Sequence, residues 1–195
     1  MKKTLLILLL ICNLTSYSQE KKWYSSSEID FIFDNEFTYL YHNGSLRYNS
    51  FTWEPDGFLL NTYAIQYDYN YLIFSKLSVG AVGGFEFQKD PNNYPMLKLG
   101  AVMRYFFVDD DNVYSYIQVL NSFTVDKEKF KNGVNARIGL GYPVLKEDSY
   151  NVKMNLFLQQ NHFNLSGAKP IFNIENEHPS YLKVHSFGIS FGVQF

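Results

Sequence analysis

The chain has 195 residues, a length that fits one domain or at most two small ones. Tyr and Phe are unusually abundant, at 16 and 18 residues, and hydrophobic residues make up 46% of the chain. A formal charge of −2 argues against a basic nucleic-acid-binding protein, and the low net charge and high hydrophobic content argue against disorder. The single cysteine can build neither a disulfide framework nor a cysteine-based zinc site.

The first eighteen residues have the organisation of a secretory signal peptide. Residues 1–3 are basic, residues 4–14 form an apolar run, and residues 16–18 supply small side chains, so we expect cleavage before Gln19. The run is too short for a comfortable membrane span, which disfavours an N-terminal membrane anchor. Cys12 lies inside this run after a bulky residue, which disfavours a lipoprotein. The mature domain is therefore expected to be 19–195, without cysteine and without a transmembrane helix.

After a polar lead-in at 19–27, hydrophobicity alternates with a period of two almost throughout, which is typical of β-strands. In chain order, the pattern predicts strands at 29–41, 58–71, 77–87, 95–106, 113–123, 134–142, 152–159 and 186–195. The register of the fifth strand stays open, because Ile117 and Val119 compete with Tyr116 and Leu120 for the apolar face.

Most of these eight strands are long, at about ten to fourteen residues, whereas strands of soluble proteins average about five or six. A tilted strand needs about 9–11 residues to cross a bilayer. No segment of helical period separates the strands, which disfavours βαβ folds.

Charged residues favour one register of each strand. Outside the fifth strand, the apolar register contains no Asp, Glu, Lys or Arg, and Lys183 would join it only at the membrane interface, where lysine can snorkel. A Lys or Arg that faces mid-bilayer costs a barrel about 2–4 kcal/mol, which gives this separation a physical cause. The opposite register, expected to face the lumen, holds Asp30, Asp34, Glu36, Asp68, Glu86, Lys98, Arg104, Arg137 and Lys153.

Residue size follows the same division. The apolar faces are rich in Phe, Tyr, Leu, Ile and Met, and a soluble barrel would have to bury these faces inside. A narrow eight-stranded barrel instead needs small residues in its interior. The sequence therefore predicts an all-β, eight-stranded, antiparallel up-and-down transmembrane β-barrel. The glycines expected to face the lumen are Gly80, Gly84, Gly100, Gly139, Gly141, Gly188 and Gly192.

The longer connections alternate with shorter ones. Long outer loops and short periplasmic turns are expected of such barrels, so we predict four extracellular loops at 42–56, 88–94, 124–132 and 163–181. Aromatic girdles should mark the two interfaces, where an apolar ring and a polar tip meet different solvents. The outer girdle is predicted at Phe37, Tyr39, Tyr41, Phe85 and Phe87, and the inner one at Tyr69, Tyr71, Tyr105, Tyr142 and Phe195.

The ending 187–195 alternates apolar and aromatic residues and closes on Phe195, which is similar to the C-terminal signal of bacterial outer-membrane barrels. The whole mature chain resembles a small protein of that family. The resemblance implies an outer-membrane location, contact with outer-membrane lipid, and recognition by periplasmic chaperones and the barrel-assembly machinery. The Ser-Gln cleavage region also resembles signal peptides of the Bacteroidetes type. We further expect a monomer without a cofactor.

Eight strands leave no wide pore, so a general porin is disfavoured. The charges of the lumen could line an ion path, but opposite charges in a narrow space more commonly neutralise one another. Glu86 and Lys98 share the lumen-facing side and flank one hairpin loop. We therefore expect them to form an interior ion pair near the outer end.

The residues of a nucleophilic triad occur in the last long loop. Ser activated by His and oriented by a carboxylate is the required chemistry, and His178 and Ser180 accompany either Glu175 or Glu177. The His-x-Ser spacing is faintly similar to that of lipid A deacylases. It lies here in a polar loop rather than on a lipid-facing strand, which favours a solvated loop without catalysis.

The other histidines give no stronger signal. His185 and Ser186 are adjacent on a strand and must point to opposite faces. His42 and His162 lie singly near strand ends, where an interfacial position is expected rather than a metal site. No H-E-x-x-H or P-loop pattern occurs. The sequence thus assigns no catalytic, cofactor-binding or metal-binding residue.

Two outer loops carry apolar clusters that could bind a partner or simply pack on the rim of the barrel. They comprise Tyr48, Phe51 and Trp53 with Arg47 in the first loop, and Ile171, Phe172 and Ile174 in the last. We therefore expect a structural or surface-interaction protein rather than an enzyme. The alternatives are a small lipid-modifying enzyme and a soluble secreted ligand-binding barrel.

Overall fold

The computed structural model describes residues 22–44, 48–55, 57, 59–91, 93–108, 112–126, 128–172 and 174–195. The predicted signal peptide and its cleavage site lie outside these residues. The described chain contains no helix of the length and hydropathy needed to cross a bilayer.

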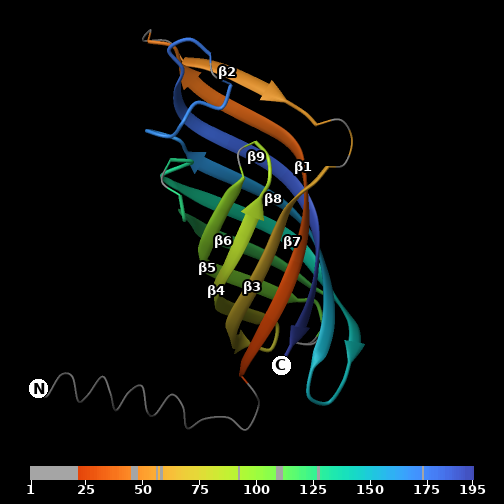
Figure 1. Ribbon diagram of the computed structural model, residues 1–195. Coiled ribbons are helices and arrows are strands. Elements are labelled where there is room, and N and C mark those ends of the chain that lie inside the picture. Colours follow the sequence, from red (N-terminus) through yellow and green to blue (C-terminus); the bar gives the residue numbers. More distant parts are fainter. Residues whose placement is uncertain are drawn as a thin grey trace, which may run out of the picture.

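Eight antiparallel strands close into a barrel, as the sequence predicts (Figure 1). Each strand pairs with its neighbour, and the last strand, β9, pairs back with β1. A ninth strand, β2, adds to the edge of β1 outside the closed barrel. The nine strands are β1 (Trp23–His42), β2 (Tyr48–Trp53), β3 (Leu59–Phe74), β4 (Leu77–Gln88), β5 (Tyr94–Phe106), β6 (Tyr114–Thr124), β7 (Asn132–Lys146), β8 (Asn151–Asn164) and β9 (His178–Gln194).

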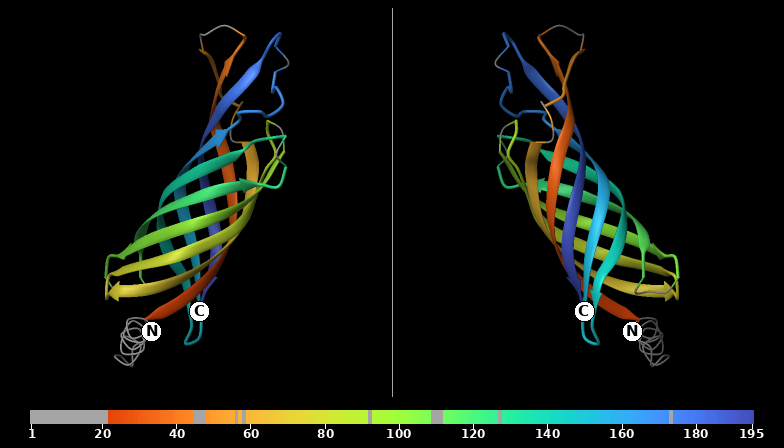
Figure 2. Two further views of the ribbon diagram at one scale, coloured as in Figure 1. Left: turned by 90° about the vertical axis from the view of Figure 1, so that its left-hand side faces the viewer. Right: turned by 90° about the vertical axis from the view of Figure 1, so that its right-hand side faces the viewer.

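The ninth strand, β2, lies within 42–56, which the sequence predicts to be an outer loop, and this part of the prediction is wrong. β1 pairs with β3 as far as Asp34, and beyond it residues 37–42 of β1 pair with β2 on that side and with β9 on the other. These residues, β2 and residues 178–184 of β9 form the extension. Figure 2 shows it rising above the other strands, at the end opposite the start of β1 and the end of β9.

The outer wall of the barrel is apolar. Ile65, Leu99 and Leu158 keep 63%, 57% and 64% of their surface exposed, although each lies in the middle of a strand. Burial of apolar side chains is the main driving force of folding in water, so such a wall is stable only against another apolar medium. Other exposed apolar residues of the wall are Ile117, Val119, Ile138, Leu140, Leu156 and Phe191.

The lumen is charged and narrow. All the ionisable residues predicted to face inwards are buried except Glu36, and Glu28 joins them because β1 begins at Trp23 rather than at residue 29. The predicted glycines make room for large neighbours: a Cβ on Gly141 would lie 2.1 Å from the Tyr114 ring. An exposed apolar wall around buried charged side chains is the reverse of what a soluble barrel requires, and the soluble-barrel alternative is wrong.

A β-bulge in β1 overturns part of the predicted outer girdle. Asp34 pairs with Ser186 and Glu36 with His185, so Asn35 is an extra residue that shifts the alternation by one. Phe37 and Tyr39 consequently lie in the interior, with 1% and 0% exposure, instead of facing lipid.

The same shift moves Glu36 out of the predicted lumen set. Its Oε1 lies 3.7 Å from the His185 Nε2 on the outer wall. Tyr41 is also not part of an outer girdle, because it is half-buried against the interior cluster that holds Phe37 and Tyr39. Of the other predicted girdle residues, five are exposed, namely Tyr69, Tyr105, Tyr142, Phe85 and Phe195, and two are half-buried, Tyr71 and Phe87.

The fifth predicted strand, β6, takes the register with Ile117 and Val119 outside. Tyr116 and Leu120 face the interior.

Candidate functional site

The lower lumen holds ion pairs among buried apolar and aromatic side chains. An NH2 group of Arg104 lies 2.8 Å from the Asp68 carboxylate and 3.7 Å from that of Glu28. The Lys153 ammonium lies 2.7 Å from the same carboxylate oxygen of Glu28, Oε1, and donates a hydrogen bond to the Ser26 hydroxyl. Carboxylates and cations therefore alternate across the barrel, and each charge is compensated by a neighbour.

Two more pairs continue this network. Arg137 lies 2.8 Å from Asp30 and places its guanidinium carbon 3.8 Å from the centroid of the Phe157 ring. Lys98 lies 2.5 Å from Glu86, which confirms the contact predicted from the sequence. Paired, buried charges occupy the lumen and favour a filled barrel over an open ion path.

Above the charges, the interior becomes apolar. A buried cluster, here called the plug, fills the end of the barrel next to the extension. Phe130 from the β6–β7 connection and Leu165 from the β8–β9 connection enter it and are fully buried. The Tyr94 ring stacks on Phe163 at 5.5 Å. The plug comprises Phe37, Tyr39, Tyr94, Met96, Phe130, Phe163, Leu165, Leu182 and Val184.

The extension carries an exposed aromatic cluster. The Phe172 ring centroid lies 5.2 Å from that of Phe51 and 5.4 Å from that of Trp53, with nearly perpendicular planes. Phe51 and Phe172 remain 49% and 40% exposed. The two apolar clusters that the sequence placed in separate loops thus form one surface, which we call the aromatic platform (Phe51, Trp53 and Phe172). Arg47 lies outside the described residues.

Glu177 holds the last loop in place beneath this platform. Its carboxylate accepts hydrogen bonds from the Tyr39 hydroxyl and from the backbone amides of Ile171, Phe172 and Ile174. Burial raises the pKa of Glu177, but these hydrogen bonds outweigh it and hold the pKa below its usual value of 4.5. The sequence indicates Glu177 only as a candidate triad member, because this role depends on contacts with Tyr39 and loop amides that leave no local pattern.

The candidate triad is not assembled. Glu177 is committed to Tyr39 and the loop amides, and the His178 ring stacks against His42 at 4.9 Å. Ser180 is the extra residue of a second bulge, between the pairs Leu40–Tyr181 and Tyr41–Pro179. Within the described residues, no hydrogen bond joins His178 to Ser180.

His185 and Ser186 point to opposite faces, as predicted. The Ser186 hydroxyl donates to Asp34 in the lumen at 2.6 Å, while His185 lies on the outer wall with Glu36. Among the described residues no group of three or more His, Cys, Asp or Glu side chains could together hold a metal ion.

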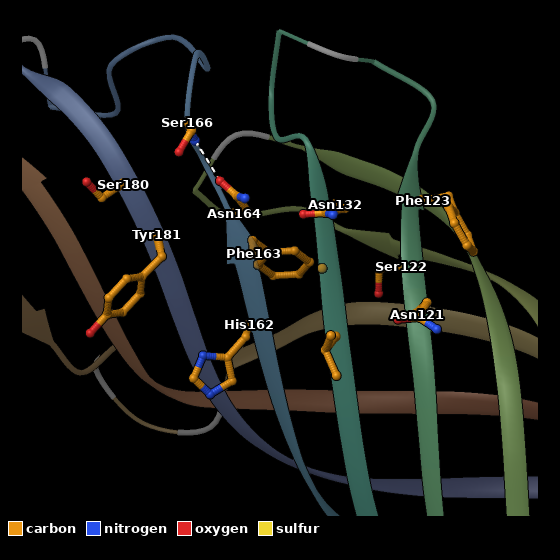
Figure 3. Close-up of a pocket in the computed structure, with 12 residues that line it drawn as sticks. Asn121, Ser122, Phe123, Asn132, His162, Phe163, Asn164, Ser166, Ser180 and Tyr181 are labelled. Atoms are coloured by element: carbon orange, nitrogen blue, oxygen red, sulfur yellow. Dashed lines mark hydrogen bonds between the residues drawn. The ribbon is translucent and has the colours of Figure 1, made fainter.

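A groove of about 540 Å³ crosses the outer wall near the extension, over β6 to β9 (Figure 3). His162 and Tyr181 line it, with ring centroids 6.4 Å apart, and the Ser166 amide donates to the Asn164 side chain at 3.0 Å. Its lining combines the polar side chains of Asn121, Asn132 and Asn164 with apolar and aromatic groups. His162 is exposed on the outer wall in this groove, and its position at a membrane interface stays a prediction.

Two further features, the bulge at Asn35 and the plug, are difficult to predict from the sequence. The polar pair Asn35-Glu36 interrupts an apolar alternation, and such an interruption is the one local signal of the bulge. The plug has no comparable signal, because Phe130 and Leu165 lie in segments without strand periodicity.

No protein-family model matches the chain, and no curated protein is significantly similar to it in sequence. Solved structures resemble it at low identity. Neisserial surface protein A is 16% identical, with 89% of this chain and 96% of that chain covered and a TM-score of 0.46. The outer membrane protein AlkL is 13% identical (89% and 88% covered, TM-score 0.49), and OprG from Pseudomonas aeruginosa is 11% identical (89% and 96% covered, TM-score 0.45).

The described architecture is that of a transmembrane β-barrel. It combines an even number of closed antiparallel strands, an apolar outer wall and a polar lumen, which together are the plan of bacterial outer-membrane barrels. The outer membrane is the location that this wall fits.

Proposed function

We propose that this protein is an integral outer-membrane barrel whose role is surface interaction, carried by the aromatic platform, and not solute conduction or catalysis. The observation that carries the proposal is the contact of Phe172 with both Phe51 and Trp53. Exposed aromatic rings held at fixed positions are the residues that most often anchor protein interfaces.

The proposal places the extension and four loops on the extracellular side. The start of β1 and the end of β9 lie at the opposite end, and the two longest connections, 43–58 and 165–177, join strands at the end of the extension (Figure 2). Long outer loops and short periplasmic turns are the usual arrangement in such barrels.

The filled interior supports a role outside the lumen. The ion-paired charges occupy the lower part, and the plug occupies the upper part. Reconstitution in a planar bilayer is expected to give no stepwise conductance, and reproducible channel openings would contradict this part of the proposal.

The test of the platform compares adhesion of cells that carry the wild type with cells that carry Phe51→Ser and Phe172→Ser together. Adhesion to protein-coated surfaces should fall to the level of cells without the gene. Tyr150→Ser is the matched control, since Tyr150 is an exposed aromatic residue at the other end of the barrel. Surface amounts are compared by heat-modifiable gel mobility. If wild-type and gene-free cells adhered equally to every surface, the proposal would be wrong.

Lipid modification is tested separately. Mass spectrometry of lipid A from cells with and without the gene should give the same acylation pattern. A changed pattern that Ser180→Ala abolished would establish the enzymatic alternative instead.

A further inference from the structure

Two histidines meet at the tip of the extension. His42 is the last residue of β1 and His178 is the first of β9, and the two are direct partners in the antiparallel ladder. Their ring centroids are 4.9 Å apart, with planes inclined by 29°. The Tyr48 ring packs on the other side of His42, at 5.8 Å and perpendicular to it.

The bulge at Ser180 creates this pair. Leu40 pairs with Tyr181, and an uninterrupted ladder would continue with Ser180 opposite Tyr41 and Pro179 opposite His42. With the extra residue, Pro179 comes opposite Tyr41 and His178 comes opposite His42. Directly opposed residues of an antiparallel pair have Cβ atoms about 4.5–5.5 Å apart and lie on one face of the sheet.

The two imidazoles have few competing contacts. Within the described residues neither ring takes part in a hydrogen bond or an ion pair, and His178 is exposed to solvent. The nearest carboxylate along the chain, Glu177, is committed to Tyr39 and to backbone amides of the last loop. The ring nitrogens are therefore available to an external ligand.

We propose that His42 and His178 together bind one divalent transition-metal ion of the class that prefers imidazole, such as Cu²⁺, Ni²⁺ or Zn²⁺. Metal–nitrogen bonds of about 2.0–2.1 Å require the two coordinating nitrogens to lie roughly 3 Å apart. Centroids at 4.9 Å fit two imidazoles on one ion once side-chain rotation turns one nitrogen of each ring, now in stacked planes, toward a common point. Calcium and magnesium are excluded as preferred ions because they require oxygen ligands.

Two protein ligands leave the other coordination positions to water or to a second molecule. The site is thus an exchangeable surface site, and the bound ion links the tips of β1 and β9, where the strands β4 to β8 no longer support them. This site does not depend on what the aromatic platform binds.

The test uses the mature full-length barrel, folded in detergent, without a histidine tag. Isothermal titration with copper, nickel and zinc chloride should give one site per chain, with affinity in the order expected for imidazole ligands, copper above nickel and zinc. His42→Ala and His178→Ala should each weaken copper binding by at least about tenfold, and the double variant should be little worse than either single one.

His162→Ala and His185→Ala are the matched controls, since both residues lie on the outer wall outside the extension. Their copper binding should equal that of the wild type. Folding of every variant is checked by heat-modifiable gel mobility, and changes at an exposed tip should leave it intact. Absence of saturable binding, or binding that survives both His42→Ala and His178→Ala, would overturn the proposal.

Discussion

The Lys98 ammonium lies 2.5 Å from the Glu86 carboxylate inside the barrel, and both side chains are buried. Removal of one partner of such a pair leaves a charge without compensation, so Lys98→Met should destabilise the barrel by about 3–5 kcal/mol. Replacement of both, Lys98→Met with Glu86→Leu, should recover most of that loss, because no charge is stranded. Urea unfolding in lipid vesicles measures the free energy of unfolding of the single and of the double variant. Equal stability of Lys98→Met and wild type would show that the pair does not matter.

The Gly188 position should not accept a side chain. A Cβ there would lie 2.3 Å from the Phe157 ring and 2.9 Å from the backbone oxygen of Phe31, so Gly188→Ala should cost about 1–3 kcal/mol. Gly83→Ala is the control, because its nearest neighbour is a flexible methyl group of Leu99 at 3.2 Å. Both changes restrict the unfolded chain equally, so the difference in urea midpoint reports the lumen clash. Similar midpoints would contradict the lumen packing.

Acid should release the last loop. The pKa of Glu177 is held below 4.5 by hydrogen bonds that outweigh its burial, so the stability it contributes is present above its unfolded-state pKa. That contribution is lost as the pH falls through the lowered pKa. Trp53 on β2 contacts Phe172 of the loop that Glu177 holds. The fluorescence of Trp53, measured in a Trp23→Phe background, should therefore shift to the red in this pH range.

Glu177→Gln should abolish this acid transition, and Glu175→Gln, at the exposed neighbouring carboxylate, should preserve it. An identical acid transition in Glu177→Gln would assign it to another group.

The loss of stability caused by a lysine on the outer face of β7 should depend on its depth in the membrane. Ile138 lies within the apolar wall, so Ile138→Lys should destabilise the barrel by about 2–4 kcal/mol. Asn132 lies on the same face of the same strand, at its first residue and close to the extension, and Asn132→Lys should cost at most about 1 kcal/mol. Equal costs in lipid vesicles would show that Ile138 does not face hydrocarbon.

The repeating features of this fold are predictable from the sequence, because each leaves a periodic trace. Alternation with period two predicts the eight strands of the barrel, and the register of Arg137 and Lys153 predicts which side chains face the lumen. Local departures from regular strand pairing leave almost no periodic pattern in the sequence. The extra residue Asn35 turned Phe37 and Tyr39 inwards, and nothing in their own residue types indicates it.

Contacts between distant segments were harder still to anticipate. The sequence identified Phe51, Trp53 and Phe172 as candidates, but only the closed barrel brings the first and last outer connections together. The His42–His178 pair depends in addition on the bulge at Ser180, so periodicity alone would have placed Pro179 opposite His42.

Collision accessibility of a nitroxide at position 156 tests the orientation of the wall most directly. The one cysteine of the sequence lies at position 12, within the predicted signal peptide, so Leu156→Cys gives the mature chain a single labelling site. For the folded protein in lipid vesicles, we predict high accessibility to molecular oxygen and low accessibility to a water-soluble nickel chelate. Low accessibility to both reagents, as in a sealed protein core, or free access of the nickel chelate would contradict a lipid-facing Leu156.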